Sequence, residues 1–175
     1  MGHKILENQK VESFSWQDVS SNIHAQNTVC WHITENCNLN CSFCEIKQNK
    51  ANFKEELKFL KKNWPNFKKQ FNKLPGTWEV FLMGGEPLSL PGILEIVNDL
   101  VKQGHKISLA TNFSFSTSMY EKFLKIVGAK LCLLFATFKP EYYNPEVFLK
   151  KAEHINNLVK AQGGQFGVGA VAEPD

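Results

Sequence analysis

Hydrophobic positions follow two alternating spacings along the chain, and this alternation predicts strands separated by helices. Short stretches rich in β-branched and aromatic residues, which are typical of buried strands, occupy residues 28–34, 78–83, 107–111, 130–138 and 166–171. Between them, apolar residues recur every three or four positions, which predicts amphipathic helices over residues 53–71, 91–104, 116–127 and 145–163.

These strand–helix units repeat about every 25–30 residues, a spacing typical of parallel strands joined by right-handed crossovers. The pattern therefore predicts an α/β fold. Pro91 and Pro145 suit the first positions of their helices, whereas Pro65 is expected to kink or divide the helix that contains it. Residues 1–27 are polar with scattered aromatics, and we expect an N-terminal extension or cap there, followed by a core over residues 28–175.

Composition indicates a globular protein and bears on its partners and its cellular compartment. It has 175 residues, enough for one domain, with 43% hydrophobic and 21% charged residues. The net charge of +3 comes without a dense Lys/Arg block, so we expect no nucleic-acid partner. No apolar run reaches the ~18–20 residues of a membrane span, so no membrane association is expected. An odd count of five Cys, three of them in one loop, indicates the reducing cytoplasm rather than a disulfide framework.

The candidate chemistry begins with three cysteines in one short segment. Cys37, Cys41 and Cys44 form a C-x3-C-x2-C spacing directly after the first predicted strand. A [4Fe–4S] cluster held by protein alone takes four Cys, so three would leave one iron open to a small molecule. Structural zinc is the alternative and would need a fourth ligand, for which Cys30 or His32 are the nearby candidates.

A second motif, Met-Gly-Gly-Glu-Pro at residues 83–87, follows the second predicted strand. Together with the Cys spacing and the aromatic Phe43 before the third Cys, it resembles the radical S-adenosylmethionine (SAM) superfamily. The resemblance implies that Cys37, Cys41 and Cys44 bind a [4Fe–4S] cluster whose open iron chelates SAM. Reductive cleavage of SAM would then yield a 5′-deoxyadenosyl radical that abstracts hydrogen from a substrate. An electron donor such as flavodoxin or ferredoxin is implied as a partner.

The resemblance also implies which other residues contact the cofactor, and most of them lie at the end of a predicted strand or in the loop that follows it. These are Phe43, Gly84, Gly85, Glu86, Thr111, Asn112, Thr137 and Val168. Some of these residues have a plainer alternative, which is a tight turn for the two glycines and an Asx turn for Asn112. Lys139 is a further candidate beside Thr137, and its plainer alternative is a surface position. The segment containing Val168 matches the family pattern only in part, because Phe166 and Ala170 stand where glycines are expected.

The family fold is a partial (β/α) barrel of six units, and only about five strands are predicted here. We therefore expect a barrel that stops before its sixth strand, either truncated or naturally short. The substrate is open between a peptide or protein and a small molecule. A non-catalytic metal-binding module, or an inactive fragment of such an enzyme, is the alternative function.

Overall fold

The structure is a computed structural model that describes residue 25, residues 27–44 and residues 53–170. The expected N-terminal extension over residues 1–27 therefore lies almost entirely outside the described residues, as do residues 171–175. Strands and helices alternate as predicted. The elements are β1 (Asn27–Thr34), α1 (Phe53–Phe71), β2 (Trp78–Gly84), η2 (Pro87–Ser89), α2 (Ile93–Lys102), β3 (Lys106–Thr111), α3 (Thr117–Val127), η3 (Gly128–Lys130), β4 (Leu131–Phe138), α4 (Pro145–Ala161) and β5 (Gln165–Ala170).

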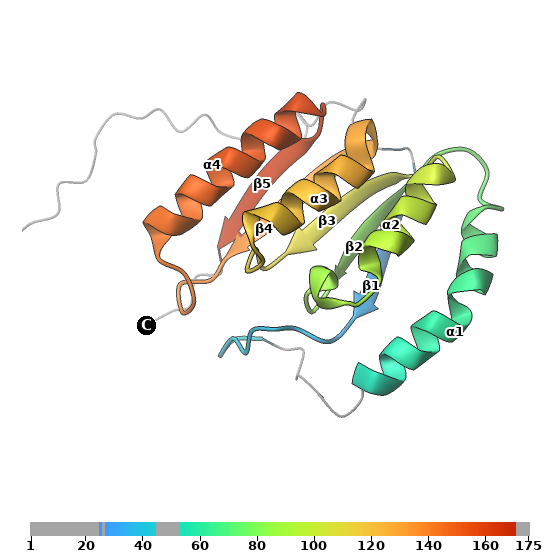
Figure 1. Ribbon diagram of the computed structural model, residues 1–175, viewed down its shortest axis with the longest axis horizontal. Helices are drawn as coiled ribbons and strands as arrows, with labels where there is room; N and C mark the ends of the chain where they lie inside the picture. Colours follow the sequence, from blue (N-terminus) through green and yellow to red (C-terminus); the bar gives the residue numbers. More distant parts are fainter. Residues whose placement is uncertain (1–24, 26, 45–52, 171–175) are drawn as a thin grey trace, which may run out of the picture.

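All five strands belong to one parallel sheet in the order β1-β2-β3-β4-β5. Helices α2, α3 and α4 lie side by side over one face of the sheet, and α1 lies beyond α2 at the β1 end (Figure 1). Among the described residues the sheet is open, running from β1 at one edge to β5 at the other. The predicted α/β class and the partial barrel of about five strands are confirmed.

Helix α1 is attached through an aromatic cluster. The centroid of the Trp31 ring on β1 lies 6.1 Å from the ring centroids of Trp64 and Phe67. It lies 5.5 Å from the ring centroid of Phe71. The α1 residues are three or four positions apart, so they share one face of the helix and pack together on the strand. Trp64 also donates a 3.0 Å hydrogen bond to Asp99 on α2, which joins the two neighbouring helices.

The two helix expectations that rested on proline have different outcomes. Helix α1 runs from Phe53 to Phe71 with Pro65 inside it, so of the two expected effects, a kink or a division, Pro65 does not divide the helix. The expectation for Pro91 needs correction. Helix α2 begins at Ile93 rather than at Pro91, because a short 3-10 turn over Pro87–Ser89 follows β2 and Gly92 caps the helix with φ of 89°.

The carboxyl ends of the parallel strands meet along one edge, where each strand passes into a loop (Figure 1). The loop after β1 contains the three cysteines, and the loops after β2, β3 and β4 contain the other predicted motifs. This edge is where reactive groups gather in (β/α) barrels. A helix long and apolar enough to cross a membrane is not found in the part of the chain that the structure describes.

Candidate active site

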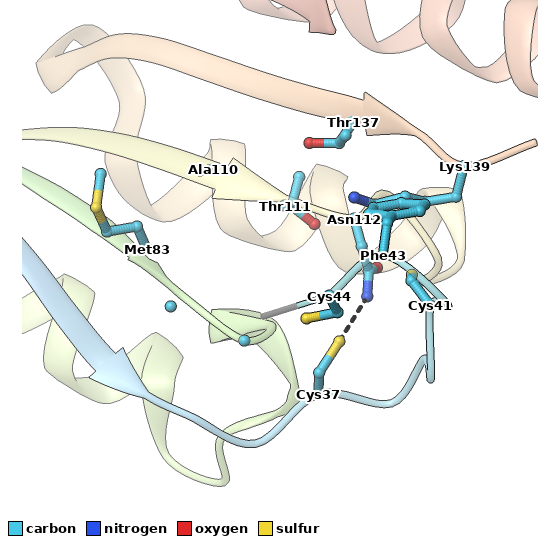
Figure 2. A pocket seen from close by; sticks show the side chains of 12 residues that line it. Cys37, Cys41, Phe43, Cys44, Met83, Ala110, Thr111, Asn112, Thr137 and Lys139 are labelled. Carbon is cyan, nitrogen blue, oxygen red and sulfur yellow. Dashed lines mark hydrogen bonds between the residues drawn. The ribbon is translucent and has the colours of Figure 1, made fainter. Parts of the chain in front are cut away.

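A pocket of about 170 Å³ opens at the carboxyl edge of the sheet. Side chains from four separate loops or strand ends surround it, and Figure 2 shows the three cysteines on one side and the ends of β3 and β4 on the other. Its lining residues are Cys37, Cys41, Phe43, Cys44, Met83, Gly84, Gly85, Ala110, Thr111, Asn112, Thr137 and Lys139. The fold therefore brings into one cavity residues that are up to about a hundred positions apart in the sequence.

The cysteine loop (residues 35–44) presents all three thiols to the pocket. Cys44 donates a 3.2 Å backbone hydrogen bond to the Cys41 carbonyl, which turns the loop so that both side chains face inward. The Leu39 amide approaches the Cys37 sulfur at 3.5 Å. Burial raises the pKa of the Cys41 thiol, and the nearby Lys139 ammonium opposes that shift. Across the described ranges, no three or more His, Cys, Asp or Glu side chains are gathered closely enough to enclose a single metal ion.

The Gly-Gly-Glu turn (residues 84–86) lies directly against the start of the cysteine loop. The amides of Gly85 and Glu86 donate 2.8 Å hydrogen bonds to the carbonyls of Thr34 and Asn36. A Cβ at Gly85 would come within 2.6 Å of the Asn36 carbonyl carbon, and Gly84 has φ of 130°, which L side chains rarely adopt. Both positions therefore require glycine, because the two backbones touch.

Glu86 points away from the pocket into the protein. Its carboxylate is fully buried and accepts hydrogen bonds from the Leu88 amide at 3.1 Å, the Asn112 amide at 2.6 Å and the Thr111 hydroxyl at 3.0 Å. Burial raises the pKa of Glu86 to about 6, and the hydrogen bonds from Asn112, Leu88 and Thr111 limit the rise. The carboxylate thus joins the loop after β2 to the end of β3 and is a positioning group rather than a pocket wall.

The loop after β3 is held from behind by a lysine of α4. Lys151 Nζ donates to the Phe113 carbonyl at 2.7 Å and to that of Phe115, and it lies 4.3 Å and 4.7 Å from the ring centroids of Phe113 and Tyr120. Phe113 is a buried residue with φ of 61°. That backbone is uncommon for a residue other than glycine and persists where its surroundings fix it. Desolvation lowers the pKa of Lys151 to about 8, against the opposing effect of the Glu86 carboxylate.

The loop after β4 closes the other side of the cysteine loop. Ser42 donates from its hydroxyl to Glu141 at 2.6 Å, and the Asn40 amide donates to the Tyr142 hydroxyl at 3.0 Å. Lys139 Nζ lies 4.7 Å from the centroid of the Phe43 ring, a cation–π distance. The cysteine loop is therefore held between the loops after β2 and β4.

Nine of the eleven predicted site residues line this pocket, and two do not. Glu86 lies behind it, as described above. Val168 lies on β5, where its neighbours Gly167 and Gly169 face the ring of Phe135 on the same side of the sheet as Thr137. Because side chains alternate along a strand, Val168 points to the opposite face, where it is 49% exposed. The prediction of an adenine contact from the Val168 side chain therefore has no support in this geometry.

The sequence reasoning missed two pocket residues, Met83 and Ala110. Each is the second-to-last residue of its strand, and each directly precedes a predicted site residue. Strand alternation could have found them, because each lies on the face opposite Leu82 or Leu109, which are buried under the helices.

Of three comparisons with known proteins, two find a similarity. The family model of the radical SAM superfamily matches residues 31–161 of the 175. No curated protein matches the sequence. A solved structure, BtrN in complex with AdoMet and 2-DOIA, resembles the fold with a TM-score of 0.51 at 12% identity. The likeness covers 81% of this chain and 56% of that one, so the chain spans little more than half the length of this structural relative.

Proposed function

The chain belongs to the radical SAM superfamily, and from that premise we propose that it holds a [4Fe–4S] cluster and SAM in the pocket at the carboxyl edge of its sheet. The observation that carries the proposal is the opening of Cys37, Cys41 and Cys44 into one cavity with Gly84 and Gly85. Bound together, the cluster and SAM would supply a 5′-deoxyadenosyl radical that abstracts hydrogen from a substrate.

The donor set suits a cluster better than zinc. Zinc draws its ligands toward one point, at about 2.3 Å from each sulfur. A cubane instead takes one thiolate at each of three separate irons. The pocket lining contains three Cys and no His, Asp or Glu, which is one ligand fewer than structural zinc takes. With three protein thiolates, the fourth iron is left for SAM.

The rest of the pocket offers SAM both polar and apolar contacts. We propose that the backbone carbonyls of Gly84 and Gly85 accept from the methionyl ammonium, and that Lys139 attracts the carboxylate. Phe43 supplies an aromatic face. Thr137 adds a hydroxyl, and Met83 and Ala110 supply apolar surface that excludes water from the reacting atoms.

The substrate class is part of the proposal, and two classes fit: a peptide or protein, and a small molecule. We also propose that a cytoplasmic flavodoxin or ferredoxin supplies the electron, with neither nucleic acid nor membrane as a partner. The competing function is a metal-binding module without catalysis, or an inactive fragment of such an enzyme. Both competitors would bind metal without cleaving SAM.

Anaerobic reconstitution tests the proposal directly. We expect about four iron and four sulfide per chain, the paramagnetic signal of a reduced [4Fe–4S] cluster, and release of 5′-deoxyadenosine from SAM. Replacing Cys37, Cys41 or Cys44 by Ala should abolish iron and sulfide uptake. Cys30→Ala is the matched control, since Cys30 lies on β1 away from the pocket lining, and it should load normally. Stoichiometric zinc without sulfide would contradict the cluster, and a loaded chain that leaves SAM intact would support the competing function.

A further inference from the structure

Asn112 lies at the end of β3 with its side-chain amide directed at one of the three cysteines (Figure 2). Its Nδ2 donates to the Cys37 sulfur at 3.4 Å and to Asn38 Oδ1 at 2.9 Å. We propose that this amide is a positioning residue that raises the reduction potential of the cluster by hydrogen-bonding the Cys37 thiolate. The inference rests on the proposed function, because it assigns a role to Asn112 toward the cluster proposed there.

The orientation of the amide is fixed by its other partner. Asn112 Oδ1 accepts a 3.0 Å hydrogen bond from the backbone amide of Ser114. A backbone N–H can only donate, so the oxygen must face Ser114 and the NH₂ group must face Cys37. A flipped amide would set two donors against each other at Ser114 and an oxygen against the thiolate sulfur.

The backbone of Asn112 is held as firmly as its side chain. Its amide donates to Glu86 at 2.6 Å and its carbonyl accepts from the Tyr143 hydroxyl at 2.7 Å, while the residue is only 6% exposed. The next residue, Phe113, has φ of 61° and its carbonyl is bound by Lys151. Contacts from α4 and from the loops after β2 and β4 thus hold Asn112 and its neighbour Phe113 in place.

A donor in this position acts unequally on the two oxidation states. Reduction adds one negative charge, part of which resides on the cysteine sulfurs, and a hydrogen bond to sulfur stabilises that charge. Hydrogen bonds to the sulfurs and low solvent exposure are recognised controls of cluster potential. Because Asn112 is buried, water competes little for its amide protons, and the electrostatic effect is stronger than at the surface.

Asn112→Asp tests the inference, since it keeps the shape and the acceptor for Ser114 but replaces the donor by a charged oxygen. We expect iron and sulfide content to stay the same while one-electron reduction becomes at least ~10-fold less favourable, a drop of about 59 mV. Asn112→Ala removes the donor without adding charge and should shift the potential in the same direction by less. The readout is a redox titration followed by the paramagnetic signal of the reduced cluster, which requires no turnover.

Asn36→Asp is the matched control. It adds the same charge beside Cys37 in the sequence, but the Asn36 amide donates to Ser89 rather than to sulfur. Equal shifts in Asn36→Asp and Asn112→Asp would overturn the inference, because charge alone would then explain them. Unchanged potentials in both Asn112 variants, or loss of the cluster from both, would also overturn it while leaving the proposed function intact. A wild-type chain that takes up no iron and sulfide would overturn both.

Discussion

At the scale of single residues, the buried carboxylate of Glu86 joins the loop after β2 to the end of β3. The motif indicated that residues 84–86 lie where the second strand ends, and in the structure β2 ends at Gly84. Which way the carboxylate points was not readable, because a residue in a turn has no periodic face. In the structure the backbone amides of Leu88 and Asn112 draw it inward. Two of its donors, the Thr111 hydroxyl and the Asn112 amide at the end of β3, are more than twenty residues away in the sequence.

The buried carboxylate predicts a pH dependence of stability. The pKa of Glu86 rises from the ordinary 4.5 to about 6, so between these values the folded state binds more protons than the unfolded state. The stability from protonated Glu86 is therefore fully present below pH 4.5 and lost as the pH rises through 6. A shift of this size corresponds to about 2 kcal/mol.

Urea unfolding at several pH values between 4 and 7 would measure this effect in the wild type and in Glu86→Gln. The variant cannot titrate at this position, so the difference in unfolding free energy between the two proteins should change by about 2 kcal/mol across the window. Parallel pH profiles for the two proteins would show that Glu86 does not titrate with a raised pKa.

At the scale of elements, the main feature is the contact between the Gly-Gly-Glu turn and the cysteine loop. Parallel strands end at the same edge, so the sequence could predict that the two loops are neighbours. It could not predict that their backbones touch, because that depends on the pairing register of β1 and β2, which shifts between His32 and Thr34. The glycines were interpreted as cofactor contacts. The structure gives them a second task, which is to position the residues that lead to Cys37.

Gly85→Ala should therefore weaken cluster binding as well as SAM binding. The added Cβ would meet backbone atoms of Asn36, which cannot rotate away as a side chain could. Overpacking of this kind typically costs about 1–3 kcal/mol. We expect the affinity for the cluster to fall about tenfold or more, measured as iron and sulfide retained against a chelator.

Gly104→Ala is the control for this prediction. Gly104 has φ of 91° and open space around its Cβ position, so its replacement strains the backbone far from the cysteines. We expect lower stability there with normal iron and sulfide retention. If Gly85→Ala retained its cluster as well as Gly104→Ala does, the contact between the two loops would have no part in cluster binding.

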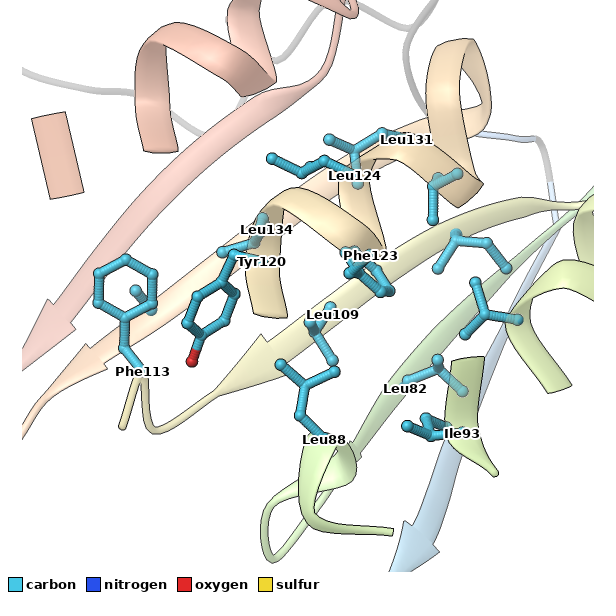
Figure 3. Packing of buried hydrophobic residues seen from close by; sticks show 14 of the residues in the cluster. Leu82, Leu88, Ile93, Leu109, Phe113, Tyr120, Phe123, Leu124, Leu131 and Leu134 are labelled. Atoms are coloured by element: carbon cyan, nitrogen blue, oxygen red, sulfur yellow. The ribbon is translucent and has the colours of Figure 1, made fainter. Parts of the chain in front are cut away.

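At the scale of the whole molecule, the helix side of the sheet contains the hydrophobic core, and the carboxyl edge contains the candidate active site. Leu82, Leu109 and Leu134 form a buried row under the helices, with Phe123 and Leu124 of α3 above the sheet (Figure 3). Apolar periodicity predicted this side well, because burial leaves a repeating signal in the sequence. The edge depends on loop contacts that leave no such signal. Val168 is an example: its strand was predicted from the apolar pattern, whereas its contact with the cofactor was predicted from a partial motif match alone.

Because of this division, stability and cluster binding should be separable by mutation. Leu124 is 1% exposed and packs near Leu131, at the end of the sheet away from the cysteines (Figure 3). Leu124→Ala should lower the free energy of unfolding by about 2–5 kcal/mol through lost burial and a cavity. Leu149→Ala makes the same change at a helical position that is 62% exposed, and should cost little.

The decisive comparison is cluster content per folded chain, measured well below the unfolding temperature of each variant. Leu124→Ala should load iron and sulfide as the wild type does, because the loops that hold Cys37, Cys41 and Cys44 make their contacts at the opposite edge. Cys37→Ala should show the reverse pattern, with no cluster and little change in the unfolding of the apo-protein. If Leu124→Ala lost its cluster while still folded, core and edge would be one cooperative unit, and the loop contacts alone would not suffice to form the site.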